Sequence, residues 1–282
     1  MFGLRFDIDS HYGLTRRVAP LLKVLDRHDT KATFFCVMGR DASLIEIAKL
    51  RFMGKGHRRS SARPQDATDS LSSDVEPTRK PGRSTFLRNP GKILYTMIYP
   101  RRVGTGRPDL LRLLQDTGHE VYPHGWSHIQ WQRNIDRIDV REHIRLCSEA
   151  HREVFGILPA GFASPGMVYN DEVLDAFDEN GIMFAGDMRG ESPFRVNGRR
   201  CLQIPVTTRK TISWLNWKGY EQSDIVDMLY QHISGNGFSV IFDHPDNMGH
   251  RELRALDVLL GRLSADGIRS IPFGQIHART MA

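Results

Sequence analysis

Residues 2–11, FGLRFDIDSH, begin as an apolar run and end in two carboxylates, Asp7 and Asp9. A buried strand that gives way to a loop would place both carboxylates where the strand ends. Far downstream, His124 and His128 stand four residues apart in HGWSH. Two imidazoles and one carboxylate can hold a metal ion, which leaves the other carboxylate as a base. Each motif alone is more typical of a turn or of surface histidines, so only their joint placement favours a site.

A strand pattern followed by a helix pattern recurs along the chain outside residues 51–107. The predicted strands are residues 2–7, 31–37, 119–122, 161–164, 182–185, 201–206, 238–242 and 268–271. The predicted helices are residues 14–28, 44–53, 108–116, 140–155, 171–180, 223–233 and 251–266. This alternation predicts a parallel α/β fold, and seven or eight units in 282 residues favour a distorted, TIM-like (β/α)7-8 barrel over an open sheet.

Six candidate site residues lie at or just past the C-terminal ends of the predicted strands. They are Asp7, Asp9, His124, Ser164, Asp187 and His244. In a parallel barrel the carboxyl ends of the strands form the active-site face, where residues remote in sequence converge. Randomly placed polar residues would be divided between both ends of the barrel. The pattern therefore predicts a metal or catalytic site at the C-terminal face of the strands.

The composition predicts one soluble α/β domain over residues 1–282. Hydrophobic residues make up 40% of the chain and the mean hydropathy is −0.40. No apolar run approaches the roughly 18–20 residues of a membrane-spanning helix. Charged residues interrupt the N-terminus from Arg5 onward, so we expect no signal peptide and a cytoplasmic protein. Three cysteines without metal-site spacing agree with a reducing compartment.

A basic insertion at about residues 54–106 interrupts the barrel pattern. Residues 51–107 hold 13 lysines and arginines against 4 acidic residues, whereas the rest of the chain holds 26 against 29. Residues 54–92 are rich in Arg, Ser, Pro and Gly, which predicts a mobile, partly disordered loop. The apolar run 93–99, followed by two arginines, suits peripheral contact with an anionic membrane surface or packing on the barrel. The cations lack interleaved aromatic residues, so we expect no nucleic-acid partner.

Five motifs, FDID, HGWSH, SPG, GDMRG and VIFDHPD, resemble those of the polysaccharide deacetylase (NodB-homology) family of metal-dependent amide hydrolases. The resemblance covers nearly the whole chain except residues 54–106. It is closest to the subgroup that deformylates 4-deoxy-4-formamido-L-arabinose-phosphoundecaprenol in lipid A modification. The segments that carry this closer resemblance are GLRFDID, KATFFCVMG, HEVYPHGWSHIQWQ, GDMRGESPF and QIPVT.

The resemblance implies a role for each member of the predicted site. Asp7 would be the catalytic base, and His244 would be the general acid that protonates the departing amine. Asp9, His124 and His128 would hold the metal. Two imidazoles and a carboxylate suit Zn²⁺ best, although Mn²⁺, Co²⁺ or Ni²⁺ could occupy the same site.

The chain departs from the family pattern in two motifs. The SPG stretch, which begins with Ser164 and Pro165, stands where the family has Arg-x-Pro-x-Gly, so the arginine that orients the base is absent. The motif from Asp187 to Arg189 lacks the tryptophan usual in polysaccharide enzymes. We hypothesise that Arg189 replaces the missing arginine or binds a substrate phosphate.

Three further residues have supporting roles that the sequence leaves open. Trp126 could stack on a sugar or pack under its loop. Asp243 or Asp246 could hold the ring of His244 in one tautomer.

These departures and the basic insertion favour a small amino sugar on a polyprenyl phosphate as the substrate. We therefore expect a metal-dependent hydrolase that removes an N-formyl or N-acetyl group at the inner face of the cell membrane. One alternative is an N-deacetylase of peptidoglycan or another polysaccharide. Another is a non-catalytic protein on the same scaffold that binds a carbohydrate or a lipid phosphate. The sequence leaves open the acyl group, the sugar and its carrier, and the oligomeric state.

Overall fold

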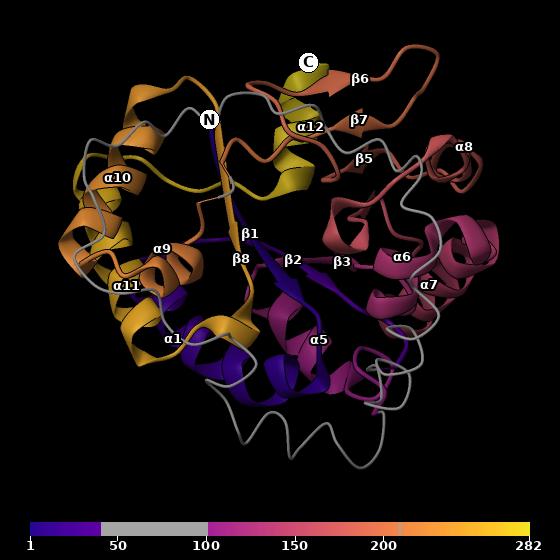
Figure 1. The fold of residues 1–282 in the computed structure, drawn as a ribbon, viewed down its shortest axis with the longest axis horizontal. Coiled ribbons are helices and arrows are strands. Elements are labelled where there is room, and N and C mark those ends of the chain that lie inside the picture. Colours follow the sequence, from indigo (N-terminus) through magenta and orange to yellow (C-terminus); the bar gives the residue numbers. More distant parts are fainter. Residues whose placement is uncertain (41–100, 209) are drawn as a thin grey trace.

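Strand β1 (Phe2–Ile8) lies near the centre of the molecule and has a parallel neighbour on each side (Figure 1). The computed structural model describes residues 1–40, 101–208 and 210–282. Strands β2 (Thr33–Cys36) and β8 (Ser239–Asp243) pair with β1, and β3 (Glu120–Pro123) pairs with β2, which gives the order β3-β2-β1-β8. Every residue of β1 is buried, as a parallel strand covered on both faces requires.

A second sheet is made of strands of only two residues each. Its order is β4 (Gly161–Phe162), β5 (Phe184–Ala185), β7 (Leu202–Gln203) and β6 (Phe194–Arg195). Strands β4, β5 and β7 are parallel, whereas β6 is antiparallel to β7.

Backbone hydrogen bonds join the two sheets at two places. The Ala163 N–H donates to the Pro123 carbonyl at 3.1 Å, which links β4 to β3. The Thr207 N–H donates to the Val240 carbonyl at 3.1 Å, which links the segment after β7 to β8. Among the described residues, β1 to β5, β7 and β8 therefore form a ring, and the predicted distorted (β/α) barrel is confirmed. The prediction of one domain over the whole chain stays a prediction.

The alternation of β1 divides its side chains between two apolar clusters. Phe2, Leu4, Phe6 and Ile8 point outward and pack in the layer between the strands and the helices. Gly3, Arg5 and Asp7 therefore face the barrel interior. That interior is filled mainly by Phe35, Phe184, Ile204, Val240 and Phe273.

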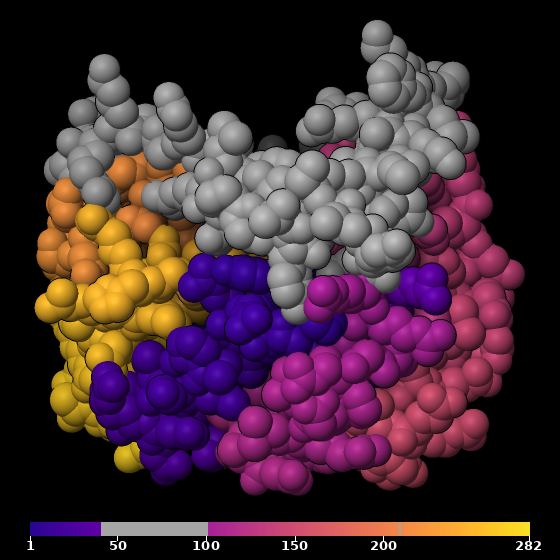
Figure 2. Space-filling view, turned by 90° about the horizontal axis from the view of Figure 1, so that it is seen from below, coloured from indigo at the N-terminus to yellow at the C-terminus, as the bar shows by residue number. Residues whose placement is uncertain are grey.

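Helices surround the ring of strands (Figure 1). They are α1 (Val18–Arg27), α5 (Pro108–Asp116), α6 (His128–Asn134), α7 (Val140–Phe155), α8 (Asp171–Glu179), α9 (Ile212–Lys218), α10 (Gln222–Gly235), α11 (His250–Ala265) and α12 (Phe273–Met281). In Figure 2 the N-terminal residues, in indigo, lie between the C-terminal residues, in yellow, and the magenta residues that follow position 101. This order matches the position of β1 between β8 and the strands β2 and β3.

The predicted helices 108–116 and 140–155 coincide with α5 and α7. The N-cap of α7 is Asp139, whose carboxylate accepts from the Glu142 N–H at 2.9 Å. Asn170 caps α8 in the same way, as predicted. Local signals suffice for these helices because the caps of α7 and α8, the proline that begins α5 and the apolar spacing are all local features of the sequence.

The predicted strand 268–271 is wrong as a strand: the structure has a single parallel bridge there, between Phe2 and Ser270. Pro272 immediately follows and begins α12, which the sequence did not predict. Side chains from two barrel strands accept the first N–H groups of α12. Thr33 accepts from Phe273 at 2.8 Å, and Glu120 accepts from Gly274 at 2.8 Å. These capping groups come from distant parts of the chain, so no local sequence pattern could predict them.

Most of the predicted insertion, and the predicted helix 44–53, lie outside the described residues. On the two sides of this segment, Arg40 and Arg102 form an antiparallel backbone bridge, and Val103 is buried. No helix among the described residues is both long and apolar enough to cross a membrane.

Candidate active site

The candidate site lies just beyond the carboxyl ends of three strands of the first sheet. Asp9 follows β1, His124 follows β3 and His244 follows β8. His128 is the first residue of α6, directly after the HGWS turn. These residues meet although up to 235 positions separate them, which agrees with the expectation for the carboxyl face of a parallel barrel.

Asp9 lies between the three histidines. Its Oδ1 atom is 3.5 Å from the Nε2 atoms of both His124 and His128. Its Oδ2 atom is 3.7 Å from the Nε2 atom of His244. One ligand atom from each of Asp9, His124 and His128 falls within 4.8 Å of the others, a grouping that could hold a metal ion.

The surroundings of His124 fit a metal ligand. Its Nδ1 atom lies 2.8 Å from the Ala163 carbonyl oxygen, which can only accept, so Nδ1 carries the proton. The lone pair of Nε2 then points toward Asp9, and this buried atom has no hydrogen-bond partner among the described residues. Burial lowers the pKa of His124 to about 4, even though Asp7 and Asp9 oppose the shift. The imidazole is therefore neutral near pH 7, the form that binds a metal.

A glycine turn brings His124 and His128 to the same place. Gly125 has a φ of +76°, in the left-handed region that favours glycine. A Cβ atom there would lie 2.7 Å from Cγ of Pro165. The turn is held by the segment after β2, in which Met38 donates to the Gly125 carbonyl at 3.0 Å. Pro165 thus supports the turn by packing.

Arg5 pairs with the predicted base, Asp7. Its Nε donates to Asp7 Oδ1 at 2.6 Å and its Nη2 donates to Asp7 Oδ2 at 2.8 Å. Burial alone would raise the pKa of Asp7, but the positive charge and the hydrogen bonds of Arg5 bring it below its usual value. The guanidinium beside Asp7 is therefore that of Arg5. It occupies the place for which Arg189 was predicted, and only the phosphate role remains as a prediction for Arg189.

Ser164 and Asp187 bind each other. The Ser164 backbone N–H donates to one carboxylate oxygen of Asp187, and its hydroxyl donates to the other at 2.9 Å. Both residues are fully buried. Burial raises the pKa of Asp187 to about 6, against the lowering effect of the Ser164 hydrogen bonds. The pair therefore links the segments after β4 and β5.

Asp243 supports His244 through the backbone. Its Oδ1 accepts from the His244 N–H at 2.8 Å, and both its oxygens accept from Ser213 at the start of α9. Burial alone would lower the pKa of His244, but the carboxylates of Asp9, Asp7 and Asp243 raise it above its usual value. A histidine whose pKa is raised by neighbouring carboxylates suits a general acid.

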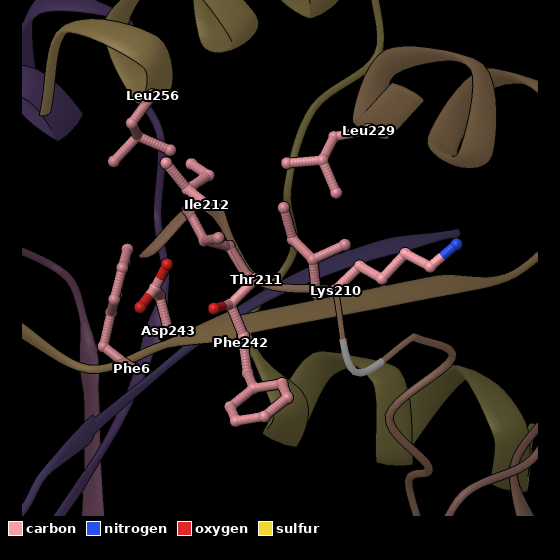
Figure 3. A pocket seen from close by; sticks show the side chains of 10 residues that line it. Phe6, Lys210, Thr211, Ile212, Leu229, Phe242, Asp243 and Leu256 are labelled. Carbon is pink, nitrogen blue, oxygen red and sulfur yellow. The ribbon is translucent and has the colours of Figure 1, made fainter. Parts of the chain in front are cut away.

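A small, mainly apolar pocket lies behind Asp243 (Figure 3). Phe6, Leu229 and Leu256 line it from β1, α10 and α11. Figure 3 shows the oxygen atoms of Asp243 and Thr211 turned toward each other, with Lys210 extending away from them. The pocket shares Asp243 with the site but belongs to the layer between strands and helices.

Trp126 is half-buried and packs on the large core cluster. A Cβ atom on Gly39 would lie 3.0 Å from its indole ring, so that ring covers the segment after β2. The packing role predicted for Trp126 is thus present, and stacking on a sugar stays a prediction.

The fold resembles that of carbohydrate deacetylases. A crystal structure of a probable polysaccharide deacetylase from Pseudomonas aeruginosa PAO1 superposes with a TM-score of 0.63 at 14% identity, over 98% of this chain and 89% of that one. The family model for polysaccharide deacetylase matches residues 1–185, which include Asp7, Asp9, His124 and His128. The chain belongs to the polysaccharide deacetylase family, and is a hydrolase that acts on amide bonds of carbohydrates.

Two curated relatives are named as probable 4-deoxy-4-formamido-L-arabinose-phosphoundecaprenol deformylases, ArnD. The protein from Shewanella sediminis is 25% identical over 96% of this chain and 83% of its own length. The protein from Wigglesworthia glossinidia brevipalpis is 33% identical over 67% of this chain and 62% of its own length. These relatives agree with the resemblance that the motifs indicate.

Arg5 is the site residue that the sequence analysis missed. Its signal was a single cation in an otherwise apolar strand, two residues before Asp7 and therefore on the same face. A buried arginine needs a partner, and the next inward residue is a carboxylate.

Proposed function

We propose that the chain is a metal-dependent hydrolase that removes an N-formyl or N-acetyl group from an amino sugar. The observation that carries the proposal is the cluster of Asp9, His124 and His128 beside a second carboxylate, Asp7, which an arginine holds. A binding protein needs no ionised carboxylate beside its metal ligands, whereas amide hydrolysis needs a group that accepts a proton.

Asp9, His124 and His128 would hold the divalent ion, of which Zn²⁺ suits this donor set best. When bound, the ion supplies a water of lowered pKa and polarises the amide carbonyl. Asp7 keeps its charge and so can take up the proton that the water loses. His244, with a raised pKa, can donate a proton to the amine that departs. His244 lies near Oδ2 of Asp9, whereas the other two histidines lie near Oδ1. The departing amine would therefore lie on the His244 side of Asp9.

A lipid-linked aminoarabinose is our proposed substrate class. Both curated relatives are named for a formamido sugar on a phosphoundecaprenol. The SPG stretch lacks an arginine and GDMRG lacks a tryptophan, and both departures also support a small lipid-linked sugar as the substrate. The excess of cations in residues 51–107 would favour a phosphate at an anionic surface, so we also propose peripheral contact with the inner face of the membrane.

The test measures formate and acetate release by the metal-loaded protein. The substrates are formamido and acetamido sugars, each with and without a polyprenyl phosphate. We expect release from the lipid-linked formamido sugar, and a fall of at least about 100-fold in kcat for Asp7→Asn. The exposed carboxylate Asp109, on α5, serves as the matched control through Asp109→Asn.

Each other outcome identifies an alternative. Preferential release of acetate from a glycan lacking the lipid would indicate a polysaccharide N-deacetylase. Binding of a sugar or lipid phosphate without release of either acid would indicate a non-catalytic protein. Activity that survives in Asp7→Asn would exclude Asp7 as the base.

A further inference from the structure

We propose that Arg5 is the positioning residue of the site: it fixes the carboxylate plane of Asp7 from the same strand. The inference deepens the proposed function, because it rests on Asp7 being the base. The hydrogen bonds of Arg5 go to Asp7 and to the Gly186 carbonyl. Arg5 acts through Asp7, to which two of its nitrogen atoms donate hydrogen bonds.

The alternation of β1 makes the pairing possible. Residues two apart in a strand point to the same face, about 6–7 Å apart along the chain. Arg5 and Asp7 therefore both face the barrel interior. The Arg5 side chain turns along the strand and meets Asp7 with two parallel N–H groups, at 2.6 and 2.8 Å. A two-point contact of this kind fixes the direction and the plane of a carboxylate, which one hydrogen bond cannot do.

The neighbouring strands hold the guanidinium between two phenyl rings. In the register of the sheet, Phe35 of β2 is paired with Asp7, and Phe242 of β8 is paired with Arg5. The guanidinium carbon lies 4.9 Å from the centre of the Phe35 ring and 5.8 Å from that of the Phe242 ring. Arg5 is fully buried. Rings at these distances attract a cation and leave it little room to move.

A third strand completes the support. Nη1 of Arg5 donates to the carbonyl oxygen of Gly186, directly after β5. A Cβ atom at Gly186 would lie 2.6 Å from this nitrogen, so the close approach depends on glycine. The next residue, Asp187, is held by Ser164. Arg5 is thus held by groups from β1, β2, β8 and the segment after β5.

This arrangement leaves Asp7 able to accept a proton. Each carboxylate oxygen has two acceptor positions, and Arg5 occupies one on each. The Oδ2 atom of Asp7 is also 3.9 Å from Nε2 of His124, so the carboxylate borders the metal cluster. A base that is held rigidly in the correct orientation toward the reacting water increases the reaction rate.

The test replaces Arg5 with lysine. Arg5→Lys keeps the positive charge that a buried Asp7 needs, but a lysine ammonium has no planar pair of donors. We expect kcat to fall by about 100-fold, the loss typical of a misplacement of about 1 Å. We expect KM and the affinity for Zn²⁺, measured by calorimetry, to stay within about 3-fold of the wild type, because Arg5 touches neither.

A double variant separates positioning from a purely structural role. If Arg5 acts through Asp7, Arg5→Lys should cause no further loss of kcat in an Asp7→Asn background. A structural role would lower the unfolding midpoint and leave kcat per folded molecule unchanged. Gly186→Ala provides a second test that keeps both charged residues, and it should also reduce kcat by displacing Nη1.

The outcomes distinguish the two proposals. Wild-type kcat in folded Arg5→Lys, with an inactive Asp7→Asn, would overturn the positioning role alone. Wild-type activity in Asp7→Asn would overturn the proposed function and this inference together. Equal fractional losses from Arg5→Lys in both backgrounds would also overturn the inference, since they would show that Arg5 acts independently of Asp7.

Discussion

Arg189 lies at the mouth side of the barrel, after β5, and forms a backbone bridge with Val206. Its side chain is half-buried, and Arg5 already holds Asp7. A half-exposed guanidinium near the end of a strand remains suited to a phosphate, which it can bind through two donors.

Arg189→Ala should therefore weaken substrate affinity without changing the chemical step. We expect KM for a phosphate-bearing sugar to rise by about 10-fold, equivalent to one charge-assisted hydrogen bond, with kcat unchanged. The same sugar without its phosphate is the internal control and should show no change in KM. An equal rise in KM for both sugars would contradict phosphate binding.

At the scale of single elements, two left-handed glycines allow a matched comparison. Gly125 has a φ of +76° between the two histidines of the candidate metal site, and Pro165 lies against it. Gly156 has a φ of +79° at the C-cap of α7, where a Cβ atom would meet nothing within 4 Å. The backbone cost of alanine is thus similar at the two positions, and only Gly125 adds a clash.

Gly156→Ala should cost about 1–2 kcal/mol in the free energy of unfolding and leave Zn²⁺ affinity unchanged. Gly125→Ala should cost more and should also reduce Zn²⁺ affinity by at least about 10-fold, because the turn sets the distance between His124 and His128. Chemical denaturation and calorimetry measure the two effects. Equal behaviour of the two variants would show that the turn at Gly125 does not set the ligand geometry.

A buried histidine at the start of β3 makes stability depend on pH. His119 accepts the Ala32 N–H through Nδ1 at 3.2 Å, which requires that this nitrogen is unprotonated. Burial, with a smaller effect from Lys31, lowers the pKa of His119 to about 4. The unfolded chain binds the proton near pH 6.5, so the folded state binds fewer protons between these values.

The contribution of His119 to stability is therefore complete above about pH 6.5 and is lost as the pH falls through about 4. It amounts to at most about 3 kcal/mol. His119→Asn keeps an acceptor for Ala32 but does not titrate in this range, so it should lose less stability between pH 7 and pH 4. Urea denaturation at both pH values measures the difference. A parallel decline of both proteins would contradict the assignment.

At the scale of the whole molecule, the candidate ligands come from two distant segments, one after β1 and one after β3, which only the fold brings together. Metal binding should therefore stabilise the folded state and not the unfolded chain. At a free Zn²⁺ concentration about 100 times Kd, binding adds about 2.7 kcal/mol. The unfolding midpoint of the wild type should rise by about 5 °C or more.

The same titration on His128→Ala should give a much smaller shift at equal Zn²⁺ concentration. His250→Ala is the control, because His250 is an exposed histidine at the start of α11. A chelator should reverse the shift in the wild type. An equal shift in all three proteins would place the bound metal elsewhere.

Much of the fold and part of the candidate site could be predicted from the sequence. Helix α7 has a local cap in Asp139, helix α5 begins at Pro108, and both have apolar residues at helical spacing. Asp9 and His124 could be grouped because each follows a strand, and parallel strands share one carboxyl face. The pairing of Ser164 with Asp187 and the caps of α12 could not be predicted, since each joins residues from different elements.

Strand β1 shows most clearly which features are local in the sequence and which depend on the tertiary structure. By itself the sequence determined that residues 2–7 form a buried strand and that two carboxylates stand at its end, because apolar spacing and strand ends are local properties. Only the tertiary structure decided what holds Asp7. Strand register sets Phe35 and Phe242 beside the Arg5 guanidinium, and barrel closure brings the Gly186 carbonyl to it. Contacts across strands depend on register and closure, which are properties of the whole barrel.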